Sequence, residues 1–133
     1  MTDVRKDYEK ALEVFKLQLK CVVNDDRKTQ MEIYTEDLHY EFPFANDRPR
    51  HIVGRDAFKK AMEPIWERRR KNNIKLAVDK YEFHATDEAG LFLAIFVLTA
   101  FIDNQKEPVS SPCVQLLRIH NGYIVEVREY FEP

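Results

Sequence analysis

The stretch "VREYFEP" near the end of the chain places an acid on an otherwise apolar face. If this stretch is a β-strand, Val127, Glu129 and Phe131 point to one side, because successive side chains of a strand alternate between its faces. That face opens with Val125 and Val127, so we expect it to be buried. An ionised carboxylate on a buried face costs several kcal/mol unless another group pairs with it. Glu129 is therefore the first candidate for chemistry.

Two kinds of role are open for Glu129. Apolar surroundings disfavour the charged form of a carboxyl group, so such an acid can donate or shuttle a proton near neutral pH. Alternatively, Glu129 forms a structural salt bridge with Arg118 or Lys80, or it lies on a turned strand that exposes it. Tyr40, on a facing element, could donate a hydrogen bond to negative charge that develops on a ligand oxygen. Glu129 and Tyr40 are the predicted catalytic residues.

Aromatic and apolar side chains are the candidates for the wall of a ligand pocket. For each of them taken alone, a place in the ordinary hydrophobic core is the more common role. His51 is included because it precedes Gly54 in a loop that could approach the mouth of the pocket. The predicted ligand-binding residues are Phe15, Phe42, Phe44, His51, Phe58, Met62 and Trp66.

Motifs for other chemistries are missing from the sequence. It has no glycine-rich phosphate loop and no GxSxG motif. The four histidines are far apart, without HExxH or HxH spacing, so no metal site is predicted. Cys113 follows Pro112 in a predicted strand, where a cysteine is usually a small buried hydrophobe. Neither a metal nor a cofactor is expected.

The length of 133 residues suits one domain, 1–133, with one hydrophobic core.

The basic cluster "ERRRKNNIK" complements the dipole at the end of a helix, and the net charge of −2 provides no basic field for nucleic acid. The longest apolar run, at 90–102, is too short to span a bilayer, and the charged stretch "MTDVRKDYEK" lacks the apolar core of a signal peptide. Two cysteines without a CxxC pair favour a reducing compartment. We expect a cytoplasmic protein that binds neither membrane nor nucleic acid.

Three helices are predicted before residue 72. Apolar residues recur at spacings of three and four along 3–23, which is typical of an amphipathic helix. "NDD" at 24–26 ends this helix and supplies the N-cap of a second helix that ends at Ile33. A third helix, "RDAFKKAMEPIWERRR", follows Gly54, and Pro64 predicts a kink or a break inside it. The apolar stripe of the first helix consists of Val4, Tyr8, Ala11, Leu12, Phe15, Leu19 and Val22.

Strands are predicted from alternating side chains. Leu38, Tyr40 and Phe42 share one face of "LHYEFPF", and "ANDRPR" is a loop. After residue 72 the pattern is that of a sheet, with a β-bulge near Asp79 and Lys80 where the alternation shifts phase. The unbroken apolar strand at 91–102 is expected to be covered on both faces. A strand at 109–120 and an Asn-Gly hairpin lead into the last strand.

Helices segregated from a mostly antiparallel sheet define an α+β fold. A curved sheet closed on one side by helices leaves a cone with a pocket inside, which is a common site for an apolar ligand. We therefore predict a cone-shaped α+β barrel in which three helices pack on the sheet.

The order of these elements, with "YTEDLHYEFP", "VGRDAFKKAM" and the ending "REYFEP", resembles the SnoaL-like branch of the nuclear transport factor 2-like superfamily. The resemblance covers nearly the whole chain and is greatest to the phenazine-biosynthesis A/B proteins. It implies a homodimer whose mostly apolar pockets hold a small cyclic molecule. Members include polyketide cyclases, ketosteroid isomerases and phenazine-pathway proteins that transfer protons without metal or cofactor. In the phenazine proteins an acid on the last strand is the general acid/base, and Glu129 matches it.

Two positions depart from these relatives. The isomerases carry their aspartate base in an Asp-Pro step on the first strand, and the corresponding step here is Phe42-Pro43. The phenazine proteins also use a histidine on the third helix, where this chain has Ala61. The resemblance therefore predicts a cyclase, isomerase or dehydratase that acts on an apolar or aromatic compound through Glu129. The alternatives are a non-catalytic ligand-binding dimer and a protein-interaction dimer on the same fold.

Overall fold

The computed structural model describes residues 4–132. The predicted first residue of the first helix, Asp3, lies outside the described residues. The elements follow the chain as α1 (Val4–Asn24), α2 (Arg27–Ile33), β1 (Tyr34–Glu41), β2 (His51–Val53), α3 (Arg55–Lys71), β3 (Lys75–Ala85), β4 (Leu91–Phe101), β5 (Val109–His120) and β6 (Tyr123–Phe131). None of the helices in this part of the chain combines the length and the apolarity that crossing a membrane requires.

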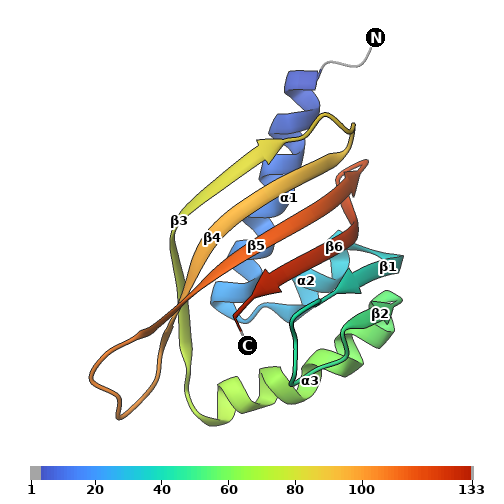
Figure 1. The fold of residues 1–133 in the computed structure, drawn as a ribbon. Coiled ribbons are helices and arrows are strands. Elements are labelled where there is room, and N and C mark those ends of the chain that lie inside the picture. Colours follow the sequence, from blue (N-terminus) through green and yellow to red (C-terminus); the bar gives the residue numbers. More distant parts are fainter. Residues whose placement is uncertain (1–3, 133) are drawn as a thin grey trace.

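The six strands form one mixed sheet in the order β2-β1-β6-β5-β4-β3. All neighbouring strands are antiparallel except β1 and β6, which run parallel. The sheet is strongly twisted and does not close on itself, and α1 crosses one of its faces while α3 lies beside β1 and β2 (Figure 1). The predicted α+β fold, with three helices on a mostly antiparallel sheet, is confirmed as an open cone.

The hydrophobic core fills the space between the helices and the concave face of the sheet. Phe15 of α1 stacks on Phe83 of β3 with 5.0 Å between ring centroids, and Phe58 of α3 stacks on Tyr40 of β1 at 4.4 Å. The N-cap of α2 is Asp26, whose side chain accepts from the backbone N–H of Thr29, as the sequence predicts. The Phe15 contact fixes α1 to the β3 end of the sheet, and the Phe58 contact fixes α3 near the opposite end.

Two local predictions are corrected in the first half. Residues 51–53 form a short strand, β2, which pairs with β1 where a loop was expected; three residues are too few for alternation to show. Helix α3 runs continuously through Pro64, so of the predicted kink or break, the break is wrong. Pro64 and Lys60 are exposed, so water can satisfy the Lys60 carbonyl that a proline leaves without its helical partner.

In the later strands one predicted irregularity is confirmed and a second one is new. The β-bulge near Asp79 and Lys80 is confirmed, because the register between β3 and β4 shifts between Val78 and Tyr81. A second irregularity, not predicted, leaves Val125 out of the pairing between β5 and β6. Val125 is therefore only half-buried, and Ile124 takes the buried position before Val127.

The strand β4 is covered on only one face. Phe92, Ala94 and Phe96 point into the core, while Ile95 and Val97 are 38% and 42% exposed on the outer face. The expectation that both faces are covered is wrong for a chain taken alone. The homodimer that the resemblance implies, which could cover this outer face, stays a prediction.

Candidate functional site

A cavity of about 280 Å³ lies between the concave face of the sheet and the helices. Its lining is mostly apolar, with Trp66, Met62 and Ile65 of α3 facing Phe96 and Leu98 of β4. Besides arginines, polar groups reach it from α1, α2, β1, β5 and β6. These polar lining residues are Gln18, Gln30, Tyr40, Gln115 and Glu129.

Glu129 is held on the cavity side of β6 by the pairing of the strands. It lies directly opposite Gln115 of β5, in register with Val127 opposite Leu117. Oε1 of Glu129 accepts two hydrogen bonds, from the Tyr40 hydroxyl at 2.7 Å and from Nε2 of Gln115 at 2.6 Å. The other carboxylate oxygen, Oε2, has no hydrogen-bond partner within residues 4–132. One oxygen is thus fixed and the other is available to a ligand.

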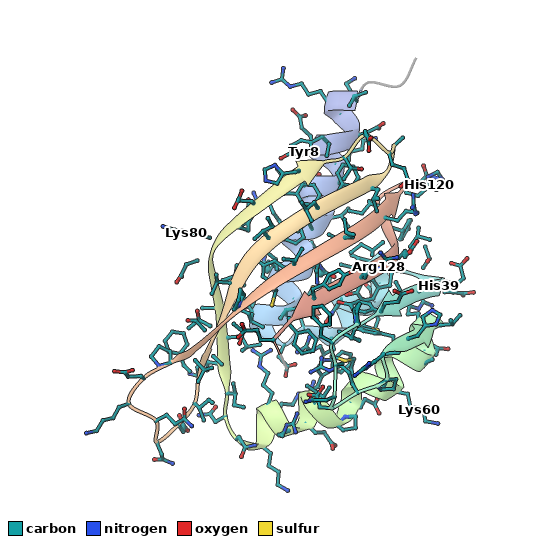
Figure 2. All side chains as sticks on the ribbon, in the orientation of Figure 1. Tyr8, His39, Lys60, Lys80, His120 and Arg128 are labelled. Carbon is teal, nitrogen blue, oxygen red and sulfur yellow. The ribbon has the colours of Figure 1, made fainter. Side chains whose placement is uncertain are left out.

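The proposed structural salt bridge of Glu129 is not formed in the described part of the chain. Arg118 lies on the outer face, where it pairs with Glu126 at 3.3 Å and Glu88 at 3.4 Å. Lys80 is exposed at the bulge of β3 and lies at the outer edge of the sheet (Figure 2). Oε1 of the carboxylate instead accepts from two neutral donors.

The protein holds the groups around Glu129 in their neutral forms. Burial, together with the nearby Glu129 charge, raises the pKa of Tyr40 and of Tyr34 well above the ordinary range. The same two causes raise the pKa of the Cys113 thiol to about 12. Cys113 therefore remains a thiol rather than a nucleophilic thiolate at neutral pH. Tyr40 remains protonated, and its one hydroxyl proton goes to Glu129, so in this arrangement it positions the carboxylate rather than donating to a ligand.

The raised pKa of Tyr40 gives a testable dependence of stability on pH. The unfolded tyrosine ionises near pH 10, while the folded one keeps its proton, so folding is favoured below about pH 10 and this contribution is lost as the pH rises further. We expect the free energy of unfolding of Tyr40→Phe to fall less steeply between about pH 10 and 12 than that of the unmodified protein. Urea unfolding at several pH values measures this. Tyr123→Phe, at a residue 49% exposed, is the control, and equal slopes for all three proteins would contradict the assignment.

Guanidinium groups line the rest of the cavity rim. Arg48 stacks over the rings of Phe42 and Phe131, with 5.0 Å to each centroid, and donates to both oxygens of Asp47. Arg27 lies over the Trp66 ring at 4.6 Å. The lining contains four arginines, Arg27, Arg48, Arg68 and Arg69, against one carboxylate, Glu129. This side of the cavity is therefore electropositive.

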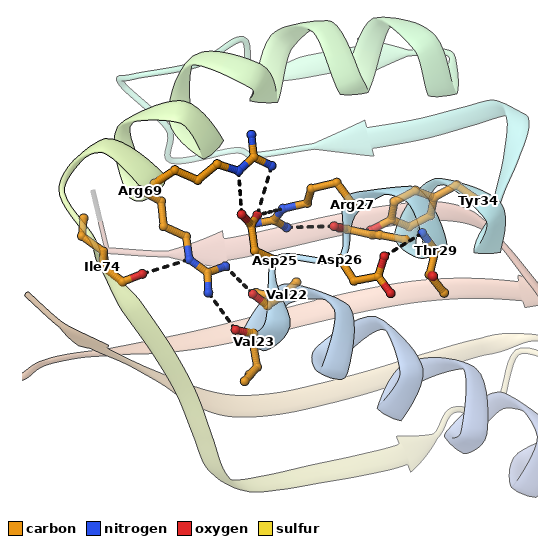
Figure 3. Close-up of polar contacts among 11 residues, drawn as sticks. Val22, Val23, Asp25, Asp26, Arg27, Thr29, Tyr34, Arg69 and Ile74 are labelled. Carbon is orange, nitrogen blue, oxygen red and sulfur yellow. Dashed lines mark hydrogen bonds and ion pairs between the residues drawn. The ribbon is translucent and has the colours of Figure 1, made fainter.

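The arginines near α2 share one acid (Figure 3). Arg27 donates to Oδ1 of Asp25 at 2.8 Å, and Arg70 donates to Oδ2 at 2.6 Å. Both cations hold the pKa of Asp25 below its usual range despite its partial burial. Arg69 donates instead to the backbone carbonyls of Val22, Val23 and Ile74. Arg68 makes only a 3.8 Å contact with Asp47 and is 60% exposed, so it is the lining arginine most able to move toward a ligand.

Several predicted site residues come together in the cavity. Glu129 and Tyr40 are hydrogen-bonded, and the predicted wall residues Phe42, Phe58, Met62 and Trp66 line the same space.

Three predicted wall residues lie elsewhere. Phe15 is buried among aromatic rings of β3 and β4, outside the cavity lining. Phe44 is 56% exposed and packs edge-on against Tyr130 on the outer side. His51 lies on β2, exposed, with Nε2 3.9 Å from Oε1 of Glu41. The sequence around these three residues does not distinguish a ring in the core or on the surface from a ring that lines a cavity.

Sequence reasoning missed the buried glutamines. Gln18, Gln30 and Gln115 are each at most 4% exposed and connect to the site. The signal was the one that singled out Glu129, a polar residue on an apolar face. Gln115 alternates with Cys113 and Leu117 on the inward side of β5, and Gln18 lies beside the apolar stripe of α1.

The sequence matches no protein-family model, and no curated protein sequence is significantly similar to it. Solved structures do share its fold. A proposed isomerase from Bacillus subtilis superposes with a TM-score of 0.82 at 22% identity, over 96% of this chain and 89% of that one. A nuclear transport factor 2-like protein from Burkholderia xenovorans superposes with a TM-score of 0.66 at 13% identity, over 94% of this chain and 91% of that one. The chain has the nuclear transport factor 2-like fold. A proposed polyketide cyclase from Xanthomonas campestris gives a TM-score of 0.71 at 17% identity, over 93% of this chain and 91% of that one. A phenazine biosynthesis-related protein from Pseudomonas aeruginosa gives 0.71 at 16% identity, over 99% and 81%.

These structural neighbours agree with the resemblance that the sequence motifs indicate. At such identities they establish the nuclear transport factor 2-like fold and leave the reaction open. In residues 4–132 no group of three or more His, Cys, Asp or Glu side chains is arranged to hold a metal ion. The described cavity lining offers the Glu129 carboxylate, its two hydrogen-bond donors, the Cys113 thiol and four arginines.

Proposed function

We propose that this protein is a cofactor-free acid–base catalyst, of the cyclase, isomerase or dehydratase type, that acts on a small apolar or aromatic carbonyl compound. The observation that carries the proposal is the half-satisfied carboxylate of Glu129, a residue of the cavity lining: Oε1 is fixed by two donors, and Oε2 has no hydrogen-bond partner among the described residues. A carboxylate with one fixed oxygen is oriented to take a proton from a ligand carbon and return it to another atom. Tyr40 acts as a positioning residue.

The ligand class follows from the shape and charge of the cavity. A volume of about 280 Å³ suits one or two rings, and the faces of Trp66, Phe42 and Phe58 favour a flat apolar body. Four lining arginines outnumber the nearby carboxylates of Asp25, Asp47 and Glu129, and they favour a negatively charged group at the rim. Arg68 is the best placed to pair with it. Aromatic acids that also carry a ketone combine both features.

Binding can be tested before any reaction is known. Trp66 is the only tryptophan in the chain and it lines the cavity, so its fluorescence reports occupancy directly. We expect aromatic keto acids to change the Trp66 emission in a saturable way, and to bind more tightly than the matching neutral amides.

A matched pair of variants controls the fluorescence experiment. Met62→Trp places a larger side chain in the cavity. It is made in a Trp66→Phe background, and its binding is measured by calorimetry. We expect Met62→Trp to abolish the saturable binding. Phe44→Leu alters an exposed aromatic outside the lining and should leave binding unchanged. If no acid or ketone binds to the unmodified protein, or if Met62→Trp binds as well as Phe44→Leu, the cavity is not the ligand site.

A second function remains open on the same geometry. Among residues 4–132 the lining contains no histidine, and Ala61 occupies the position at which the resembling phenazine proteins carry a second proton-transfer group. A non-catalytic ligand-binding dimer, in which Glu129 only orients the ligand, would need no such group. Turnover that depends on Glu129 separates the two functions.

A further inference from the structure

A continuous chain of hydrogen bonds links the pocket acid to an arginine at the edge of the helices. It starts at Arg27, passes through four buried side chains from four different elements, and ends on Glu129. We propose that this chain is a positioning relay: Arg27, Gln30, Tyr34, Gln18 and Gln115 together fix Oε1 of Glu129 as a charged acceptor and leave Oε2 for the ligand. The inference rests on the role proposed above for Glu129, and it extends the site to Tyr34, which lies outside the cavity lining.

Every link of the relay is within hydrogen-bond distance, and the last one, to the carboxylate, is the shortest. Nη1 of Arg27 donates to Oε1 of Gln30 at 2.8 Å, and Nε2 of Gln30 donates to the Tyr34 hydroxyl at 3.0 Å. The Tyr34 hydroxyl donates to Oε1 of Gln18 at 2.8 Å. Nε2 of Gln18 donates to Oε1 of Gln115 at 3.0 Å, and Nε2 of Gln115 reaches Glu129 at 2.6 Å.

The direction of the relay is fixed by chemistry at its two ends. A guanidinium group has donors and no acceptor, so the atom of Gln30 that faces Arg27 must be its carbonyl oxygen. Its amide nitrogen must then donate to Tyr34, whose single proton must go on to Gln18. Gln18 must accept this proton with its carbonyl oxygen, so its amide nitrogen donates to the carbonyl oxygen of Gln115. The amide nitrogen of Gln115 then donates to Glu129. All five bonds run from the cation toward the carboxylate.

A chain of aligned donors favours negative charge at its end. Hydrogen bonds in series polarise one another, and burial strengthens each of them because water does not compete. The three glutamines and Tyr34 are each at most 4% exposed. The Arg27 side chain is 11% exposed, and Asp25 holds it in place. Burial lowers the pKa of Arg27 and Asp25 opposes this, so the cation at the head of the relay is maintained.

The relay predicts how Glu129 responds when a link is cut. Tyr34→Phe removes one oxygen atom from the middle of the chain and keeps the ring. Tyr8→Phe is the matched control, because the Tyr8 hydroxyl donates to the Phe83 carbonyl at 2.7 Å and takes no part in the relay. We expect the pH at which the Glu129 carboxyl carbon changes its NMR signal to rise by half a unit or more in Tyr34→Phe. It should not change in Tyr8→Phe.

Neighbouring groups do not obscure this measurement. Tyr40 and Tyr34 on β1 and Cys113 on β5 are the titratable groups that face Glu129, and their raised pKa values keep them neutral from about pH 4 to 9. The lining arginines stay charged throughout. A signal that moves in this range therefore reports Glu129.

A second pair of variants guards against a purely structural explanation. Arg27→Lys keeps a donor toward Gln30 and should restore most of the midpoint that Arg27→Met loses. Equal midpoints in the unmodified protein, Tyr34→Phe and Arg27→Met would overturn the relay. The measurement needs neither ligand nor turnover, so its outcome is independent of the proposed function. If the midpoints shift as expected but the protein shows no turnover, the relay positions an acid in a ligand-binding protein.

Discussion

Glu129→Gln is expected to lower turnover on a carbonyl ligand by about 10²- to 10⁴-fold, which is the usual contribution of a general acid or base. The amide keeps the size of the side chain, and its oxygen can still accept from Tyr40 and Gln115, so the fold and the cavity are retained. What is lost is the group that takes up a proton. Because ligand contacts are otherwise unchanged, kcat should fall while KM changes little.

Glu126→Gln provides the matched control for this experiment. Glu126 lies three residues earlier on β6, on the outer face, where it pairs with Arg118. It makes the same chemical change on the same strand without touching the cavity, and should keep full turnover. A Glu129→Gln protein that works as fast as Glu126→Gln would rule out Glu129 as the acid–base group. Binding of the ligand with no turnover by any of the three proteins would favour the non-catalytic function.

The fold could be predicted largely because its elements are long and periodic. The amphipathic pattern of α1, the Asn-Gly turn before β6 and the phase shift in β3 each depend on neighbouring residues only. The predictions that failed depend on partners distant in the chain. The strand β2 exists because β1 offers it a ladder, and the displaced Val125 reflects pairing between β5 and β6.

The site could be predicted only in part for the same reason. Glu129 and Tyr40 stand out because each occupies an inward position on an alternating strand. Nothing in the sequence near Gln18, Gln30 or Tyr34 indicates that they connect, because they meet only when α1, α2 and β1 are packed together. A buried glutamine is an isolated irregularity in a sequence, and the relay appears only from the three-dimensional contacts.

Arg69 also contacts segments that are far apart in the chain. Among the arginines of the cavity rim, its loss should destabilise the fold most. Its three nitrogens donate to the carbonyls of Val22 and Val23, at the end of α1, and of Ile74, just before β3. The last carbonyls of a helix have no partner inside the helix, and a charged donor to each contributes about 1.5–3 kcal/mol. One side chain therefore joins α1, α3 and the start of β3.

Arg69→Met is expected to lower the free energy of unfolding by about 3 kcal/mol, since the bonds are not additive and water can reach some of the freed carbonyls. Arg68→Met is a control one residue away on the same turn of α3, with the same change in charge and helix propensity. Arg68 is exposed and makes only the long contact with Asp47, so its loss should cost no more than about 0.5 kcal/mol. Urea unfolding measures both. Equal losses would mean that the positive charge of the rim, rather than the three carbonyl contacts, is what stabilises this corner of the fold.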